Sequence, residues 1–108
     1  MSITVNIYYT GKNGAARAFA EEMMKSGIAD EICREDGNER YEYFYPAEDN
    51  ETVLLIDSWR DTAALDFHHN SPVMAKIAEM RNKYDVHMRV ERYVSASGGE
   101  EDEKYIRR

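Results

Sequence analysis

Cysteine is nearly absent from this 108-residue sequence, and no apolar run approaches the roughly 20 residues that a membrane span needs. A single cysteine, Cys33, cannot form an intramolecular disulfide or a cysteine-based metal knuckle. No basic, leader-like segment precedes the first alternating stretch of the chain. These shortages predict a soluble protein of a reducing compartment, the cytoplasm, with no membrane partner.

Basic charge is also scarce, because 14 Lys and Arg residues face 21 Asp and Glu residues, a net charge of −7. Such a field repels phosphate polyanions, so we expect no nucleic-acid partner. Metal-ligand spacing is missing as well, since His68 and His69 are consecutive rather than four residues apart. The GKNG segment at 11–14 precedes a helical pattern but lacks the ending of a phosphate-binding loop. The sequence therefore predicts neither a metal site nor a nucleotide site.

Hydrophobic residues make up 43% of the chain and include eight Tyr, enough for one modest core. Alternation with a period of two predicts four strands, at 3–9, 39–45, 52–59 and 86–94. Apolar positions three and four residues apart predict one long helix over 15–35. The same spacing predicts a second helical region over 61–84, N-capped by Asp61 and broken at Ser71 and Pro72.

The order β-α-β-β-α-β is typical of the ferredoxin-like α+β class, a four-stranded antiparallel sheet with helices on one face. The strand at 52–59 is apolar on both of its alternating sets, so the open face of the sheet also needs cover. A second copy of the chain is the simplest cover, and we expect a homodimer. Residues 1–95 form the predicted domain, and residues 96–108 form a charged, flexible extension.

Two polar or aromatic positions stand out within the predicted strands. Asn6 interrupts an apolar strand with a side chain that both donates and accepts hydrogen bonds, which fits a pocket wall or a solvated sheet face. Tyr41 belongs to a tyrosine stripe that fits either a cavity for a phenol or a cross-strand ladder. We take Asn6 and Tyr41 as candidate substrate-binding residues.

Three phrases carry a resemblance to a known family: GNERYEYF at 37–44, VLLIDSWRDTAAL at 53–65 and HHNSPVM at 68–74. In order and spacing, residues 3–94 resemble the antibiotic biosynthesis monooxygenase domain. The resemblance implies a dimeric α+β barrel. It also places Trp59 at the family's aromatic position near the end of the third strand and His68 at its histidine position.

Relatives of this kind include cofactor-free oxygenases of quinols and polycyclic phenols. The resemblance therefore implies a cofactor-independent monooxygenase that oxidises an electron-rich aromatic with O2. His68 is the candidate catalytic base, and Trp59 is a candidate pocket wall, although a core anchor fits it equally. A non-catalytic binding or stress-response module with the same pocket is the alternative. Haem degradation is disfavoured, because apolar residues around Ala78 stand where the axial histidine of that subgroup lies.

Overall fold

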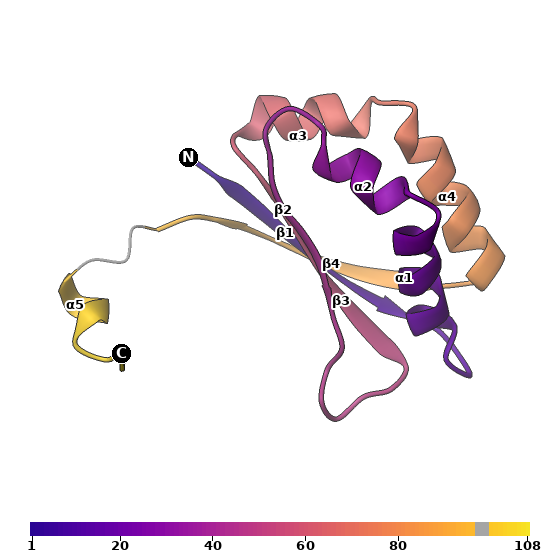
Figure 1. Ribbon diagram of the computed structural model, residues 1–108, viewed down its shortest axis with the longest axis horizontal. Coiled ribbons are helices and arrows are strands. Elements are labelled where there is room, and N and C mark those ends of the chain that lie inside the picture. Colours follow the sequence, from indigo (N-terminus) through magenta and orange to yellow (C-terminus); the bar gives the residue numbers. More distant parts are fainter. Residues whose placement is uncertain (97–99) are drawn as a thin grey trace.

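The computed structural model describes residues 1–96 and 100–108 as one antiparallel sheet with its connecting helices. The strands are β1 (Ile3–Thr10), β2 (Asn38–Phe44), β3 (Thr52–Trp59) and β4 (His87–Val94), in the spatial order β2-β3-β1-β4. The connecting helices are α1 (Ala15–Lys25), α2 (Ile28–Cys33), α3 (Thr62–His69) and α4 (Val73–Tyr84). Figure 1 shows these four helices together on one side of the sheet. The predicted ferredoxin-like α+β fold is confirmed.

The prediction of one continuous helix over 15–35 is wrong. The chain forms two helices there, because Gly27 adopts a φ of +88°, in the left-handed region, and separates α1 from α2. Residues with a Cβ rarely adopt this conformation, so glycine is the residue that allows the turn. The spacing of apolar residues reports which face is buried, but it does not report a change in the direction of the helix axis.

The two faces of the sheet are set by strand alternation. On β1, the side chains of Ile3, Val5, Ile7 and Tyr9 are buried beneath the helices. They lie opposite every second residue of β3, from Trp59 to Val53. The residues in between face the side of the sheet on which none of α1–α4 lies, and those of β1 are only partly buried or exposed.

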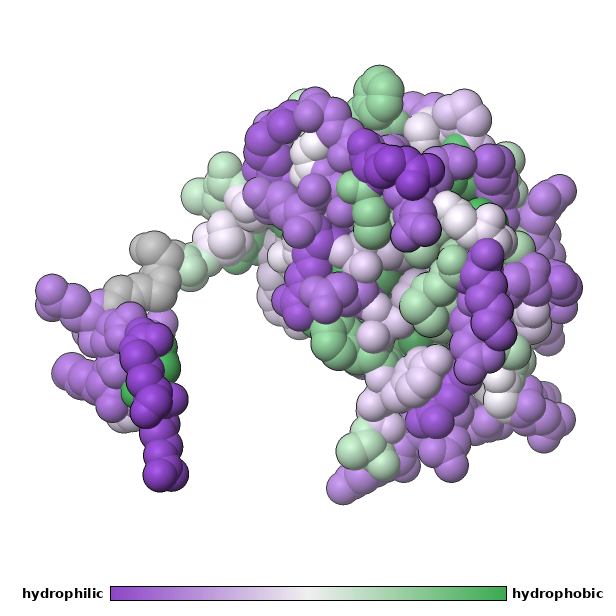
Figure 2. All heavy atoms as spheres, in the orientation of Figure 1, coloured by the Kyte–Doolittle hydropathy of each residue, from purple (hydrophilic) through white to green (hydrophobic). Residues whose placement is uncertain are grey.

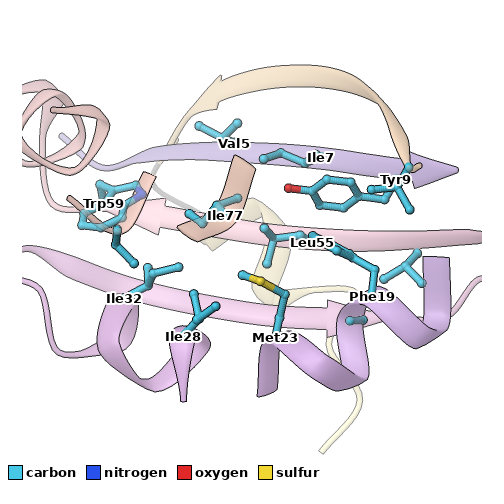
Figure 3. Packing of buried hydrophobic residues seen from close by; sticks show 14 of the residues in the cluster. Val5, Ile7, Tyr9, Phe19, Met23, Ile28, Ile32, Leu55, Trp59 and Ile77 are labelled. Carbon is cyan, nitrogen blue, oxygen red and sulfur yellow. The ribbon is translucent and has the colours of Figure 1, made fainter. Parts of the chain in front are cut away.

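A single hydrophobic cluster fills the space between the sheet and the helices. Figure 3 shows Trp59 at one end of this cluster and Phe19 beside Tyr9 at the other, with Met23, Leu55 and Ile77 between them. The Tyr9 and Phe19 rings meet with centroids 4.7 Å apart. Polar side chains cover most of the outer surface visible in Figure 2, as expected for amphipathic helices.

The C-terminal residues that the structure describes form a short helix, α5 (Glu100–Glu103), none of whose side chains is buried. The predicted extension at 96–108 lies partly outside the described residues, and its division from the domain at residue 95 stays a prediction. In the described parts of the chain, 1–96 and 100–108, no helix has the length and apolar character of a membrane span.

Candidate active site

The end of α3 places His68 against the sheet. Asp61 begins this helix by accepting a hydrogen bond from the Ala64 backbone N–H at 2.9 Å, which confirms the predicted N-cap. After the helix, the Ser71 hydroxyl donates to the His68 carbonyl oxygen at 2.7 Å. The His68 side chain is thereby held in the interior, where only 4% of the residue is exposed.

The His68 imidazole stacks on the indole of Trp59, with ring centroids 4.7 Å apart and an interplanar angle of 26°. Trp59 is the last residue of β3 and is completely buried. It therefore serves both as a core anchor and as a rigid platform beneath the histidine. His69, by contrast, is an exposed residue, as expected for two adjacent positions about 100° apart around a helix.

Glu35 holds the other side of the imidazole. Its Oε2 atom lies 2.7 Å from His68 Nδ1, and only 13% of the Glu35 side chain is exposed. Because a carboxylate only accepts hydrogen bonds, this contact places the imidazole proton on Nδ1 and leaves Nε2 as the basic nitrogen. A carboxylate behind a histidine is a common way to fix both the tautomer and the orientation of the ring.

Gly37 makes this contact compatible with the fold. Its φ is +87°, and a Cβ atom at this position would lie 2.5 Å from the Ala64 Cβ of α3. Any larger residue would therefore push the segment that follows α2 away from α3. Since Glu35 and His68 lie on these two segments, glycine at position 37 lets them come together.

Asp57 brings a second carboxylate to the same region. It lies two residues before Trp59 on the helix-covered face of β3, and it is only 5% exposed. Burial raises the pKa of Asp57 to about 6, against the opposing effects of the Trp59 indole N–H and of His68. Among the described residues, Asp57 Oδ1 has no well-aligned hydrogen bond. Such an atom is available to a ligand.

Tyr41 lies on the same face, because it is the register partner of Asp57 on β2. Its hydroxyl hydrogen-bonds to that of Tyr43 at 2.9 Å, and burial raises the pKa of Tyr41 well above its ordinary value. On β1, the Tyr9 hydroxyl accepts a hydrogen bond from Arg81 of α4 at 3.0 Å. These phenols therefore stay neutral at physiological pH and offer hydroxyl groups to the interior.

A cavity of about 40 Å³ lies between the helix-covered face of the sheet and helices α3 and α4. Its wall includes Val5, Tyr41 and Asp57 from the strands and His68, Met74 and Arg81 from the helices. An apolar cavity that accepts benzene measures about 150 Å³, whereas a single water needs at least roughly 10–15 Å³. The cavity as it stands has room for water, and a ring requires side chains to move.

Asn6 does not join this group. It lies on β1 between Val5 and Ile7, so its side chain projects to the opposite, helix-free face of the sheet. Its register partners there are Ile56 on β3 and Glu91 on β4. The structure therefore brings His68, Trp59 and Tyr41 together and places Asn6 on the other side of the sheet. The Oδ1 atom of Asn6 is buried, and it has no partner among the described residues.

Comparison with known protein families decides the relationship. Residues 2–80 match the antibiotic biosynthesis monooxygenase family, which is well over half of the chain. The chain belongs to this family. The sequence has no match among curated proteins.

Solved structures support the same fold for this family member. One is SnoaB, a cofactor-independent oxygenase from Streptomyces nogalater, with 15% identity, a TM-score of 0.75, and 90% of this chain and 95% of that chain covered. A conserved protein from Methanosarcina mazei has 22% identity, a TM-score of 0.73, and coverages of 86% and 91%. A protein from Mycobacterium tuberculosis has 17% identity, a TM-score of 0.75, and coverages of 91% and 98%. At these identities the likeness shows the fold.

Sequence reasoning missed several side chains of this monooxygenase-family site, namely Glu35, Asp57, Tyr9 and Arg81. Asp57 carried a usable signal, because it is an acid within an otherwise apolar strand and shares a face with Trp59. Glu35 carried none, since 33 residues separate it from His68. In the chain that the structure describes, no three His, Cys, Asp or Glu side chains converge as metal ligands would.

Proposed function

We propose that the protein is a cofactor-independent monooxygenase-type enzyme that oxidises an electron-rich phenol or quinol with O2. Membership of the antibiotic biosynthesis monooxygenase family supports the reaction class. The observation that carries the proposal is the buried Glu35–His68 pair stacked on Trp59 at the wall of a cavity. A general base with a fixed tautomer, beside a flat aromatic surface, suits the removal of a proton from a phenol.

His68 Nε2 is the proton acceptor in this proposal. The substrate anion that forms is electron-rich enough to reduce O2 directly. For an anthrone-type substrate, a ring methylene with two hydrogens becomes a carbonyl group. One oxygen atom of O2 enters that carbonyl, and the other leaves as water with the two hydrogens. The substrate therefore supplies all the electrons, and the protein supplies the base and an enclosed site.

The site must widen to admit such a substrate. Met74 is a partly buried wall residue of the cavity with three rotatable side-chain bonds. Rotation of this flexible side chain would add room to the cavity. We expect a single-ring phenol or quinol to need less rearrangement than a polycyclic one.

Oxygen uptake by the His68→Ala and His69→Ala variants tests the proposal, with anthrone and hydroquinone as substrates. We expect His68→Ala to lower kcat by about a hundredfold or more, since a positioned base contributes about 10²–10⁴ in rate. With these uncharged substrates the His69→Ala control should stay within a few fold of wild type, because Glu35 and Trp59 hold His68 and not His69. The loss in His68→Ala should shrink as the pH approaches the substrate's own pKa, because an ionised phenol needs no base.

A non-catalytic binding module is the second candidate, because the Asp57 Oδ1 atom at the cavity, which has no partner among the described residues, would hold a ligand hydroxyl without any reaction. This candidate predicts that phenols bind but that neither substrate consumes oxygen above the uncatalysed rate. Equal turnover by both histidine variants, with unchanged melting, would remove His68 as the base. Loss of activity at every pH together with early melting would make the residue structural.

The protein is also proposed to act as a homodimer joined through the helix-free face of the sheet. Leu54 and Ile56 of β3 and Phe44 of β2 lie on this face and remain only partly buried. Asn6 adds a buried, unpaired carbonyl oxygen there, among the described residues, that a second copy is able to satisfy. A stable pairing of this kind should bury more than about 1,000 Å².

A further inference from the structure

Positive charge gathers at one side of the cavity, although the protein as a whole is strongly acidic. Arg81 of α4 and His69 of α3 both line the cavity. Arg92 of β4 is the register partner of Val5, another wall residue, so it lies on the same face of the sheet. The three side chains come from three different elements, and we call them the basic mouth.

His69 and Arg81 line the same cavity, and the charge of Arg92 reaches His69 as well. The pKa of His69 is lowered first by burial, then by His68 and Arg92 and to a smaller extent by Arg81, against the opposing carboxylate of Asp66. Like charges raise the free energy of an empty site, and an anion bound among them lowers it. This arrangement therefore favours the binding of an anion at this side of the cavity.

Neither arginine of the basic mouth is neutralised by the protein itself. Among residues 1–96 and 100–108, no carboxylate forms an ion pair with Arg81 or Arg92. Arg81 is half-buried and donates one hydrogen bond, to Tyr9, whose hydroxyl Figure 3 shows directed toward the side of Ile77. Its Nε–H is buried and has no acceptor among the described residues. A buried guanidinium N–H that lacks an acceptor is available to donate a hydrogen bond to an oxygen anion.

The deeper wall of the cavity has the opposite character. Asp57 lies there with an unpaired Oδ1 atom, and Glu35 lies behind His68. Two carboxylates repel an anionic group and accept hydrogen bonds from a hydroxyl group. A ligand that satisfies both regions therefore carries a hydroxyl at its inner end and a negative charge at its outer end.

We propose that the substrate class is a hydroxyaryl carboxylate, whose carboxylate is bound by Arg81 and Arg92 while its phenolic hydroxyl faces His68 and Asp57. This inference rests on the proposed function for the role of the hydroxyl, but the recognition of the carboxylate is a statement about binding alone. The net charge of −7 disfavours polyanions such as nucleic acids and anionic membrane surfaces, whereas a small monoanion meets only the local charge of the basic mouth.

Binding of para-hydroxybenzoate and of its uncharged methyl ester separates charge recognition from ring binding. Trp59 is the only tryptophan, and its stacking on His68 makes its fluorescence a direct reporter, with calorimetry as the second measurement. We expect the carboxylate to bind about tenfold more tightly than the ester at low salt, as charge-assisted hydrogen bonds allow. The preference should fall as salt is added.

Two arginine variants and one matched control test the residues. Arg92→Gln should reduce the preference for the carboxylate to a few fold, and Arg81→Gln should abolish it. Arg89→Gln makes the same charge change on the same strand, but Arg89 faces the other side of the sheet, where it pairs with Glu91. This control should leave the preference intact. Arg92 is exposed on the edge strand β4, so its variant is expected to fold.

Three results would overturn the inference: an ester that binds as tightly as the carboxylate, a carboxylate that does not bind at millimolar concentration, or equal effects of Arg89→Gln and Arg92→Gln. Oxygen uptake with gentisate, a quinol that bears a carboxylate, keeps the two proposals apart. Arginine-dependent binding of gentisate without oxygen uptake supports the inference and contradicts the oxygenase proposal. Uptake with gentisate whose KM no arginine variant alters supports the oxygenase and contradicts the inference.

Discussion

The two faces of the sheet are built from the same strands but have different chemistry. On β3, Asp57 and Trp59 face the helices and are buried, whereas Leu54 and Ile56 face the other side and are only partly covered. The helix-covered face combines carboxylates, an imidazole and phenols around a cavity. The helix-free face presents a mixed surface, in which apolar side chains of β3 lie beside Asn6 and beside charged residues of β2 and β4. Successive residues of a strand point to opposite faces, so a shift of one position along β3 decides whether a side chain belongs to the site or to the helix-free face.

Burial explains what each face is able to do. Under the helices, desolvation raises the pKa values of Asp57, Tyr41 and Tyr9, so each group keeps its proton to a higher pH than it does in water. The helix-free face lacks such a cover from α1–α4, and its Arg89 and Glu91 pair with each other at 3.0 Å along the same strand. The first face is suited to proton transfer, and the second is suited to association.

Truncation of a residue on the helix-covered face should cost much more stability than truncation of a residue on the helix-free face, and this is the largest effect that we expect. We expect Trp59→Ala to lower the free energy of unfolding by about 3–5 kcal/mol, because it empties a completely buried site and removes the platform under His68. Ile56→Ala on the other face should cost only about 1 kcal/mol in an isolated chain, since its side chain is already partly exposed. Urea unfolding at submicromolar protein measures both. Similar losses for the two variants would contradict the assignment of the faces.

A charge on the helix-free face tests its proposed role in dimerisation. Leu54→Lys should convert the dimer to a monomer of unchanged secondary structure, because Tyr8 and Phe44 flank position 54 and offer a buried lysine no carboxylate. The matched control is Phe67→Lys on the outer surface of α3, where the side chain is 70% exposed. Light scattering at micromolar concentration should report half the mass for the first variant only. A wild-type protein that is already monomeric contradicts the dimer.

Much of the fold was predictable from local patterns. The strand at 52–59 was correct to the residue, because both of its ends are marked by clear changes in composition. The Asp61 cap and the break near Ser71 were also predictable, since each depends on one residue type at one position. The helix at 15–35 was mispredicted at Gly27, where a backbone conformation rather than a side-chain pattern sets the boundary.

The site was less predictable than the fold. The sequence indicated His68, Trp59 and Tyr41, which the structure brings to one face, and it indicated Asn6, which lies on the other. It gave no sign of Glu35, because the contact with His68 depends on how the turn after α2 packs against α3. Contacts between distant segments follow from tertiary packing, which the period of a single segment does not encode.

The buried carboxylate of Asp57 should make stability depend on pH. Its pKa is about 6 in the folded protein against 3.8 in the reference state, a difference of about two units. The folded state therefore binds this proton more tightly, and the free energy of unfolding falls as the pH rises from about 4 to about 6. Asp57→Asn should remove that loss and stabilise the protein at pH 7 by up to about 3 kcal/mol, with little change near pH 4. Urea unfolding at both pH values measures the difference.

An exposed acid provides the control for Asp57. Asp66 lies on the outer surface of α3, and Asp66→Asn makes the same change of charge there. This variant should leave the free energy of unfolding nearly unchanged at both pH values. If Asp57→Asn destabilised the protein at neutral pH instead, the carboxylate would have to be a required hydrogen-bond acceptor, and its role in the cavity would be structural.

The smallest effect is expected from removal of residues 96–108, and it bears directly on what covers the helix-free face. The described part of this segment contains one short helix with no buried side chain, and its Tyr105 and Ile106 are 84% and 48% exposed. Truncation should therefore move the Tm by no more than a few degrees and leave the dimer intact. Calorimetry and light scattering of the truncated protein measure both quantities. A Tm lowered by more than about 10 °C, together with new binding of a hydrophobic dye, would mean that the chain's own end packs against Leu54 and Ile56. The cover of that face would then be intramolecular, and the Leu54→Lys variant should destabilise the monomer rather than dissociate a dimer.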